Sequence, residues 1–188
     1  TIVSGCMAER TRFRAYLVYS ACVSAFVYPV IVHWCWSSNG WLSAFRGNPL
    51  FGVGYVDFAG SGVVHTTGGF LGLMGTVFLG PRKGRFDKDE NGKIRGIPGH
   101  SVVLQSLGCF IMFFGWYGFN CGSTLAMSGG LWKVAATAAM NTTLAPAVSA
   151  VCGLFTGKII FRSWSLVITL NCILGGLVAI TASCSIVQ

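Results

Sequence analysis

Residues 56–80 read VDFAGSGVVHTTGGFLGLMGTVFLG, an almost unbroken apolar run. A helix needs about 20 such residues to cross a bilayer, so this run is long enough to span a membrane. The ionisable residue His65 lies inside it. Because an ionisable group within a membrane is costly unless it faces a cavity or a partner, His65 is the first candidate functional residue.

The composition of the whole chain favours a membrane protein. Of its 188 residues, 53% are hydrophobic and only 10% are charged, and the mean hydropathy is +0.67, far from the balance of soluble domains. A formal net charge of +8 would suggest nucleic-acid binding in a soluble chain. Here the basic residues lie in short gaps between apolar runs, where they set the orientation of helices. We therefore expect no nucleic-acid partner.

Five apolar runs are each close to the length of a spanning helix. They cover residues 15–36, 57–80, 101–120, 134–160 and 165–187. We therefore expect an all-α membrane protein, a polytopic transmembrane helical bundle embedded in the lipid bilayer. Residues 1–8 read like the tail of a further helix, so we expect residues 1–188 to be a fragment of a longer protein.

The basic residues alternate along the gaps between these runs. Eleven of the Lys and Arg residues fall in alternate gaps, whereas only Arg46 and Lys133 fall in the other two. Basic loops stay in the cytoplasm by the positive-inside rule, so the helices at 15–36, 101–120 and 165–187 are expected to run outward.

Two prolines and several glycines are expected to shape the helices. Pro29 and Pro146 lie inside expected helices, where each removes a backbone hydrogen bond and favours a kink. Gly68, Gly72 and Gly75 recur along one expected helix and allow a neighbouring backbone to approach closely.

Three features that resemble known motifs are set aside. The eight cysteines lie mostly in apolar runs without a C-x-x-C pair, so we expect small core residues and no disulfide or metal site. Residues 87–98 begin like a calcium loop, but Pro98 stands where a bidentate Glu is needed, which favours a solvated turn. Residues 141–143 match a glycosylation sequon inside an expected helix, where interhelical hydrogen bonds are the better interpretation.

The histidines could in principle bind haem, which keeps a membrane oxidoreductase as the enzyme-class alternative. Counting along the expected helices places His33, His65 and His100 at three different depths, so no two of them share a haem within this chain. We expect no cofactor, no metal and no enzymatic activity.

The second run places a carboxylate above the histidine. Asp57 precedes the expected helix at its outer end, where an aspartate caps a helix well and is favoured by the helix dipole. His65 follows roughly 12 Å deeper at the helical rise, approaching the middle of a hydrocarbon core about 30 Å thick.

Three more side chains are expected near the same outer level. Trp36 closes the outer end of the first helix, and Phe119 and Ser123 lie at the outer end of the third. A tryptophan ring face attracts cations, a phenylalanine can close a narrow passage, and a serine hydroxyl can accept a hydrogen bond from an ammonium-like donor. This arrangement indicates a binding vestibule above a pore.

Segments along almost the whole chain resemble one known family. They are AERTRF (8–13), YPVIVHWCWSSNGW (28–41), DFAGSGVVH (57–65), GPRKGRFD (80–87), FGWYGFNCGS (114–123) and GGLVAITASCSIV (175–187). On these segments the chain resembles the ammonium transporter superfamily (Amt/Mep/Rh), and is most similar to the plant-type ammonium transporters.

The resemblance implies an ammonium-transporter fold of eleven helices, built from two inverted five-helix halves plus a last helix. It also implies a homotrimer with one pore in each subunit, located in the plasma membrane. Residues 1–188 would form part of one ammonium transporter domain and hold its fourth to eighth helices. The second pore histidine and the other gating phenylalanine of the family would then lie outside the chain.

The same motif matches imply residue roles. Trp36 and Ser123 correspond to the outer ammonium site, and Phe119 to one of two gating phenylalanines. Asp57 corresponds to the aspartate that supports the site, His65 to the first pore histidine, and Thr181 would line the lower pore.

The predicted function is transport of ammonium. The ion would be recruited at the aromatic outer site and deprotonated, and ammonia would pass, with or without the proton, through the histidine-lined pore. The alternatives are a Rhesus-type channel for ammonia or carbon dioxide and an ammonium sensor.

Overall fold

The structure is a computed structural model that describes residues 1–187. Helices are the main regular elements of this part of the chain, accompanied by two isolated β-bridges, Ser43–Tyr55 and Lys88–Ile94. The all-α fold expected from the sequence is therefore confirmed. The helices form two compact units: one contains residues 1–55 and 62–99, and the other contains residues 56–61 and the chain from His100 onward.

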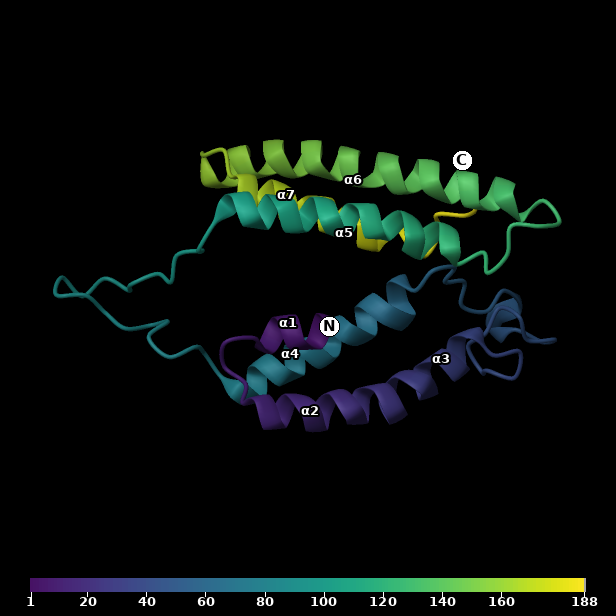
Figure 1. Ribbon diagram of the computed structural model, residues 1–188, viewed down its shortest axis with the longest axis horizontal. Helices are drawn as coiled ribbons and strands as arrows, with labels where there is room; N and C mark the ends of the chain where they lie inside the picture. The colour runs from purple at the N-terminus through teal and green to yellow at the C-terminus, as the bar shows by residue number, and fades with distance from the viewer. Residues whose placement is uncertain (188) are drawn as a thin grey trace. The chain divides into compact units, whose positions relative to one another are not determined.

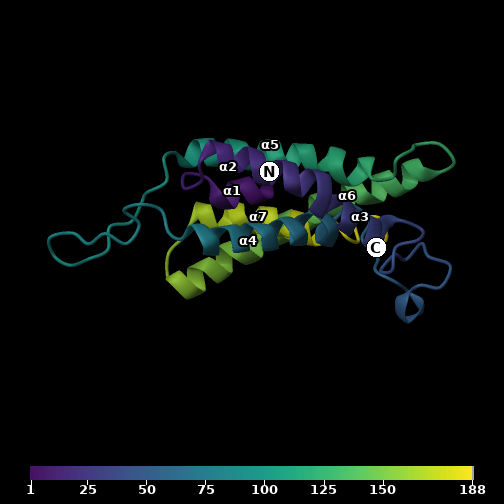
Figure 2. The same cartoon turned by 90° about the horizontal axis from the view of Figure 1, so that it is seen from below.

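The first unit holds the N-terminal helices. Its elements are α1 (Ile2–Met7), α2 (Phe13–Cys22), the π-helix η1 (Val23–Val27), α3 (Tyr28–Trp36), the 3-10 turn η2 (Leu50–Gly52), the π-helix η3 (Ser61–Thr66), whose first residue belongs to the second unit, and α4 (Thr67–Leu79). Helix α1 packs along α4 (Figures 1 and 2).

Glycines on α4 allow this close packing. A Cβ atom added to Gly72 would lie 2.6 Å from Cys6 Sγ, and one added to Gly68 would lie 3.0 Å from Ile2. Small residues at such spacing let two helix backbones approach in an apolar environment. The expectation for these glycines is therefore met by the packing of α1 on α4.

The helix from Phe13 to Trp36 changes its winding before Pro29. The backbone N–H of Tyr28 donates to the oxygen of Val23, five residues earlier, and residues 23–27 form a π-helical turn. A proline lacks the N–H and crowds the preceding turn, and a π-bulge widens the turn at such a point. The disturbance expected at Pro29 therefore takes the form of a wide turn.

The second unit contains three long helices, α5 (Val102–Gly122), α6 (Leu131–Phe161) and α7 (Leu166–Ile180). They pack on one another in both views (Figures 1 and 2). Ser101 and Ser165 cap α5 and α7, because each hydroxyl accepts a hydrogen bond from a backbone N–H three residues later. Helix α6 continues through Pro146 as one element.

Helices α6 and α7 approach most closely at Gly176. A Cβ atom at this position would lie 2.7 Å from the Cβ atom of Ser149 and 2.9 Å from the backbone oxygen of Ala145. The adjacent Gly175 faces open space, since a Cβ atom there would meet nothing within 4 Å. One glycine of this pair is thus required for packing and the other is not.

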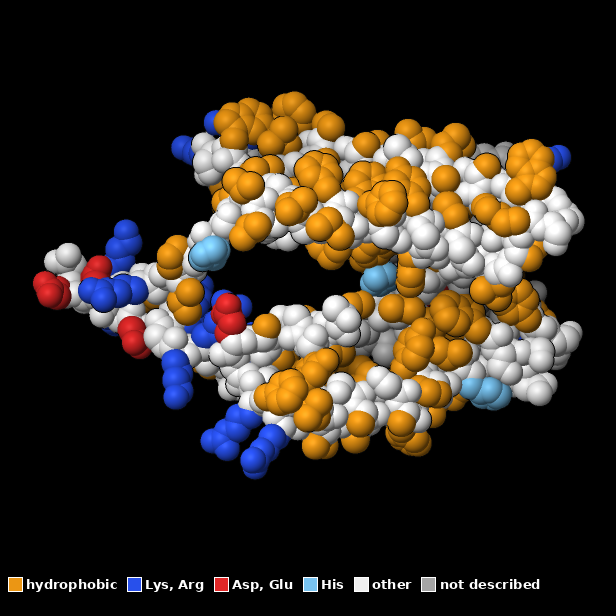
Figure 3. All heavy atoms as spheres, in the orientation of Figure 1, with side chains coloured by type: hydrophobic (Ala, Val, Ile, Leu, Met, Phe, Trp, Pro, Cys, Tyr) orange, Lys and Arg blue, Asp and Glu red, His pale blue; other side chains and the backbone are white. Residues whose placement is uncertain are grey.

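The helices overlap each of the five ranges expected from the sequence. Among residues 1–187, four helical stretches are long and apolar enough to cross a membrane: 13–36, 61–79, 102–122 and 131–161. Helix α7 is shorter, at 15 residues, and turns follow it, so a fifth crossing over residues 165–187 stays a prediction. Figure 3 shows hydrophobic side chains spread over the helices and Lys and Arg gathered near the helix ends and on the loop at the left.

Residues 81–100 form a charged loop without a helix. Asp89 Oδ1 accepts hydrogen bonds from the backbone N–H groups of Asn91 and Lys93, both at 2.9 Å. This is the local pattern of an aspartate-stabilised turn, in agreement with the turn expected there. At the start of the loop, Arg82 forms an ion pair with Glu9 at 2.9 Å.

Candidate functional site

Asp57 organises the start of the helical segment that carries His65. Asp57 is only 5% exposed, and its Oδ1 atom accepts hydrogen bonds from the backbone N–H groups of Gly60 and Ser61, both at 2.9 Å. Gly60 has φ 107°, which favours glycine. Ser61 is the first residue of η3, so Asp57 satisfies a donor that a helix start otherwise leaves unpaired.

The Asp57 turn is bonded to the chain that follows α7. The backbone N–H of Ala59 donates to the oxygen of Thr181 at 3.1 Å, and that of Phe58 donates to the oxygen of Ala182 at 2.9 Å. These bonds explain why residues 56–61 belong to the second unit although both neighbouring segments belong to the first.

Thr181 is buried at the same end of this unit. It is 0% exposed, and its hydroxyl donates to the oxygen of Leu177 at 2.7 Å and accepts from Trp116 Nε1 at 2.9 Å. The bond between Ala59 and Thr181 places Thr181 at the level of the Asp57 turn. The role expected for Thr181 in lining the lower pore stays a prediction.

Phe119 and Ser123 occupy the last turn of α5 and the residue that caps it. Phe119 is 39% exposed. Its ring makes an edge-to-face contact with the ring of Trp116, with centroids 6.0 Å apart and planes at 66°. Ser123 Oγ donates to the backbone oxygen of Phe119 at 2.8 Å. Because this bond uses the hydroxyl hydrogen, the oxygen lone pairs of Ser123 can still accept a hydrogen bond.

Trp36 and His65 belong to the first unit. Trp36 is the half-buried last residue of α3. His65 lies in the π-helix η3, also half-buried, and its Nε2 atom is enclosed. π-helical turns occur often at functional sites. The other histidine of the first unit, His33, is exposed.

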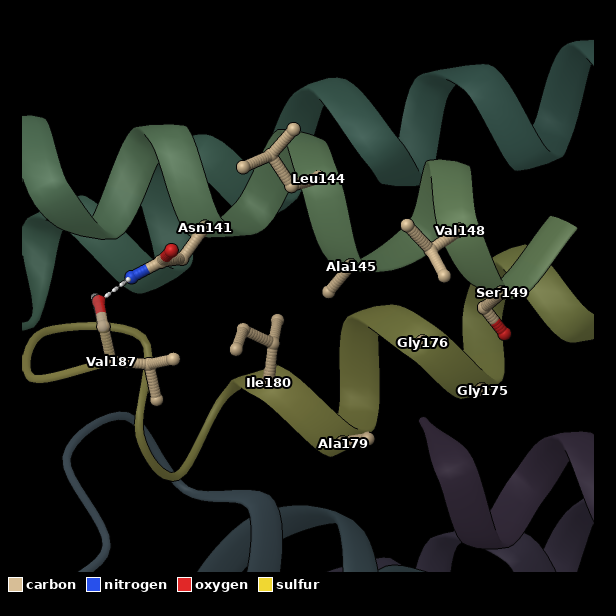
Figure 4. A pocket seen from close by; sticks show the side chains of 10 residues that line it. All are labelled: Asn141, Leu144, Ala145, Val148, Ser149, Gly175, Gly176, Ala179, Ile180 and Val187. Carbon is tan, nitrogen blue, oxygen red and sulfur yellow. Dashed lines mark hydrogen bonds between the residues drawn. The ribbon is translucent and has the colours of Figure 1, made fainter. Parts of the chain in front are cut away.

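Two buried asparagines bind across helices in the second unit. Asn120 is 0% exposed and donates from Nδ2 to Thr142 Oγ1 at 2.9 Å. Asn141 Nδ2 donates to the backbone oxygens of Cys184 and Val187, both at 2.8 Å; Figure 4 shows the second bond. The expectation that residues 141–143 serve hydrogen bonding between helical segments is confirmed at all three positions, because Thr143 Oγ1 shares a hydrogen bond of 2.7 Å with the Tyr117 hydroxyl of α5.

A groove of about 640 Å³ lies beside these bonds, between α6 and α7 (Figure 4). Apolar side chains such as Leu144, Val148 and Ile180 form most of its wall. None of the six predicted site residues lines it.

The structure therefore connects three predicted site residues within the second unit. Hydrogen bonds and one ring contact join Asp57, Thr181 and Phe119, and Trp116 is the link between the last two. Trp116 was not a candidate in the sequence. Its place inside an apolar run, away from the helix ends where tryptophans usually anchor, was the available signal. Among residues 1–187, no three His, Cys, Asp or Glu side chains cluster in a way that could hold a metal.

Comparison with known proteins places the chain in one family. The sequence model of the Ammonium Transporter Family matches residues 1–188. Ammonium transporter 1 member 1 of Oryza sativa subsp. japonica is 49% identical over 198 residues, covering 100% of this chain and 39% of its own length. Ammonium transporter 1 member 2 of Arabidopsis thaliana is 46% identical, with coverage of 100% and 38%.

Solved structures give the same result. A protein named Sensor Amt Protein superposes with a TM-score of 0.84 at 33% identity, covering 100% of this chain and 44% of its own. Mep2 of Saccharomyces cerevisiae superposes with a TM-score of 0.81 at 29% identity, covering 100% and 39%.

The chain spans about two-fifths of the length of the curated relatives that it matches. Four helical stretches among residues 1–187 are long and apolar enough to cross a membrane, as expected of a multi-pass membrane protein. Since the family match covers every residue and the plant relatives are nearly half identical, the chain belongs to the Ammonium Transporter Family.

Proposed function

We propose that the protein carries ammonium across the plasma membrane and is a transporter, not an enzyme. The observation that supports this most strongly is the family match over residues 1–188, together with relatives named as ammonium transporters at 46–49% identity. By the same analogy, we propose that the complete protein is a homotrimer with one pore in each subunit.

The first step of the proposed mechanism is capture of ammonium at the outer surface. The motif match assigns this site to Trp36, Phe119 and Ser123. An aromatic ring face attracts a cation by about 0.5 to 2 kcal/mol. The hydrogen bond from Ser123 Oγ to the Phe119 oxygen supports the assignment of Ser123. It uses the hydroxyl hydrogen, so the lone pairs of the serine oxygen can accept a hydrogen bond from an N–H donor.

The second step is loss of a proton. A charge at the centre of a bilayer costs at least about 2.5 to 3.5 kcal/mol, and more on other scales. Cation–π attraction at the mouth cannot offset this cost along the whole passage. Ammonium is therefore dehydrated and deprotonated near the mouth, and neutral ammonia crosses the apolar passage. Potassium has no proton to lose and is rejected.

Asp57 supports the site by fixing the backbone that leads to His65. Its Oδ1 atom holds the N–H groups of Gly60 and Ser61, and His65 lies one turn further along the same helical segment. In this role the buried carboxylate sets the direction of the pore helix. Its negative charge also favours a cation near the outer end of the pore.

His65 lines the passage that ammonia takes. A neutral imidazole offers one donor and one acceptor, so it can bind ammonia from either side and can hand a proton to another imidazole. Thr181 is proposed to line the lower part of this passage, and its hydroxyl accepts a hydrogen bond from Trp116 Nε1.

A growth assay tests the proposed function. Cells that lack their own ammonium transporters would express the complete protein and grow on low ammonium as the only nitrogen source. Growth, with uptake of labelled methylammonium, is expected. Protein present at the plasma membrane without growth or uptake would contradict transport and favour sensing, which the name of one structural relative suggests for that relative. Uptake that excludes the methylammonium cation while ammonia still passes would favour a Rhesus-type channel.

A further inference from the structure

We propose that Trp116 is a positioning residue: it fixes the ring of Phe119 and links it, through Thr181, to the turn that carries Asp57. The proposal rests on the proposed function, because Phe119 is assigned there to the mouth of the passage. All four residues lie in the second unit, so the contacts belong to one compact body.

The first link is the contact between the two rings. Trp116 and Phe119 are three residues apart on α5, a spacing that places side chains on one helix face. Their centroids are 6.0 Å apart with planes at 66°, an edge-to-face geometry that aromatic pairs favour. Since Phe119 is 39% exposed, enclosure alone does not fix its ring. The Trp116 ring supplies a directional contact.

The second link fixes the Trp116 ring itself. Its Nε1–H, the only polar group of the indole, donates to Thr181 Oγ1 at 2.9 Å. The Thr181 hydroxyl hydrogen is already used, because it donates to the oxygen of Leu177 at 2.7 Å. This bond fixes the rotamer of Thr181 and points a lone pair toward the indole. Trp116 is therefore held at a defined angle by a residue that is 0% exposed.

The third link joins Thr181 to the Asp57 turn. The backbone oxygen of Thr181 accepts from Ala59 at 3.1 Å, two residues after Asp57, whose Oδ1 atom holds Gly60 and Ser61. The Asp57 turn thus binds the backbone of Thr181, and the Trp116 indole binds the side chain of the same residue. A change at either one reaches the ring of Phe119 through Thr181.

An interfacial anchor is the simpler role for a tryptophan in a membrane protein. An anchor keeps its indole N–H at the membrane surface, among water and lipid head groups. Trp116 instead directs its N–H to a buried threonine. The geometry therefore favours positioning over anchoring.

The direct test measures how the surroundings of the ring at position 119 change. In the complete protein, Phe119 is replaced by p-cyanophenylalanine and the nitrile stretching band is recorded. Trp116→Phe, which keeps a ring but removes the N–H, and Thr181→Val, which keeps the shape but removes the hydroxyl, should change the band in the same way. Thr181→Ser keeps the hydroxyl and should leave the band unchanged.

Matched controls come from the same unit. Trp164 meets Phe155 edge to face at 6.0 Å, and Thr169 donates to the oxygen of Ser165, four residues earlier, at 3.1 Å. Trp164→Phe and Thr169→Val should leave the nitrile band unchanged. Three results would overturn the proposal: Trp116→Phe and Thr181→Val leave the nitrile band unchanged, the controls shift the band equally, or Thr181→Ser shifts it as much as Thr181→Val does.

Transport kinetics give the second readout. Methylammonium uptake by the complete protein, corrected for surface abundance, should show a maximal rate about 5 to 10 times lower in Trp116→Phe and in Thr181→Val, with KM changed less than about twofold. The double variant should be no slower than the slower single variant, because both remove one link. Fully multiplied effects would overturn the proposal. If the wild type carries no methylammonium, the proposed function fails, and the nitrile band alone decides on Trp116.

Discussion

At single residues, the hydrogen bonds of Asp57 give a sharp stability prediction. Asp57→Ala removes the acceptor for two backbone N–H groups, and loss of such a cap lowers the free energy of unfolding by about 0.5 to 2 kcal/mol. Asp57→Asn keeps an Oδ1 acceptor and should lose less. Thermal unfolding of the detergent-purified protein, followed by fluorescence-detected size exclusion, measures the difference.

Asp89→Ala is the matched control for Asp57→Ala. Asp89 also accepts from two backbone N–H groups at 2.9 Å, but in the charged loop and without bonds to another element. Its replacement should change the melting temperature less. Equal shifts for Asp57→Ala and Asp89→Ala would show that the Asp57 turn adds nothing beyond its local bonds.

The sequence predicted the candidate functional residues better than it predicted the contacts that these residues make. Asp57 was expected to cap the following helix, and its Oδ1 atom does bond the first residue of η3. Its link to Thr181 joins distant parts of the chain, and no periodicity reports such a contact. For the same reason Trp116 was not singled out.

At the level of the helices, two neighbouring glycines of α7, Gly175 and Gly176, allow the effect of helix packing on stability to be measured apart from the effect of helix propensity. In Gly176→Ala, the new Cβ atom would lie 2.7 Å from the Cβ atom of Ser149 and 2.9 Å from a backbone oxygen. Backbone atoms cannot move aside, so overpacking should destabilise the protein by about 1 to 3 kcal/mol. Thermal unfolding of the purified protein measures this loss.

Gly175→Ala provides the comparison one residue away. A Cβ atom there meets nothing within 4 Å, and alanine favours a helix over glycine by about 1 kcal/mol. This variant should melt at or above the wild-type temperature. A Gly176→Ala protein as stable as Gly175→Ala would mean that α6 and α7 do not pack as closely as described.

Helix positions could be predicted because apolar length and helix caps are local properties of the sequence. Ser101 and Ser165 begin α5 and α7, and runs of apolar residues follow each. The π-helical turns could not be predicted, because they depend on how a turn relaxes around Pro29 or begins after the Asp57 cap. Composition does not contain that information.

For the whole molecule, the basic loops predict its orientation in the membrane. Residues 81–100 contain six Lys and Arg residues, so this loop should lie in the cytoplasm. The loop at residues 125–130 has no Lys or Arg and should lie outside. An epitope inserted after Gly92 should bind antibody only in permeabilised cells, and one inserted after Gly129 should bind in intact cells. The reverse pattern would contradict the proposed direction of transport.

The proposed function is tested without cellular regulation by purified protein in liposomes. Vesicles containing the complete wild-type protein should take up labelled methylammonium at least about tenfold faster than empty vesicles, a difference of about 1.4 kcal/mol in the barrier. Excess potassium should not compete. His65→Ala should bring the rate close to that of empty vesicles, whereas His33→Ala, at an exposed position, should match the wild type. Wild-type protein that is correctly inserted yet no faster than empty vesicles, or a His65→Ala protein as fast as the wild type, would contradict transport through a histidine-lined pore.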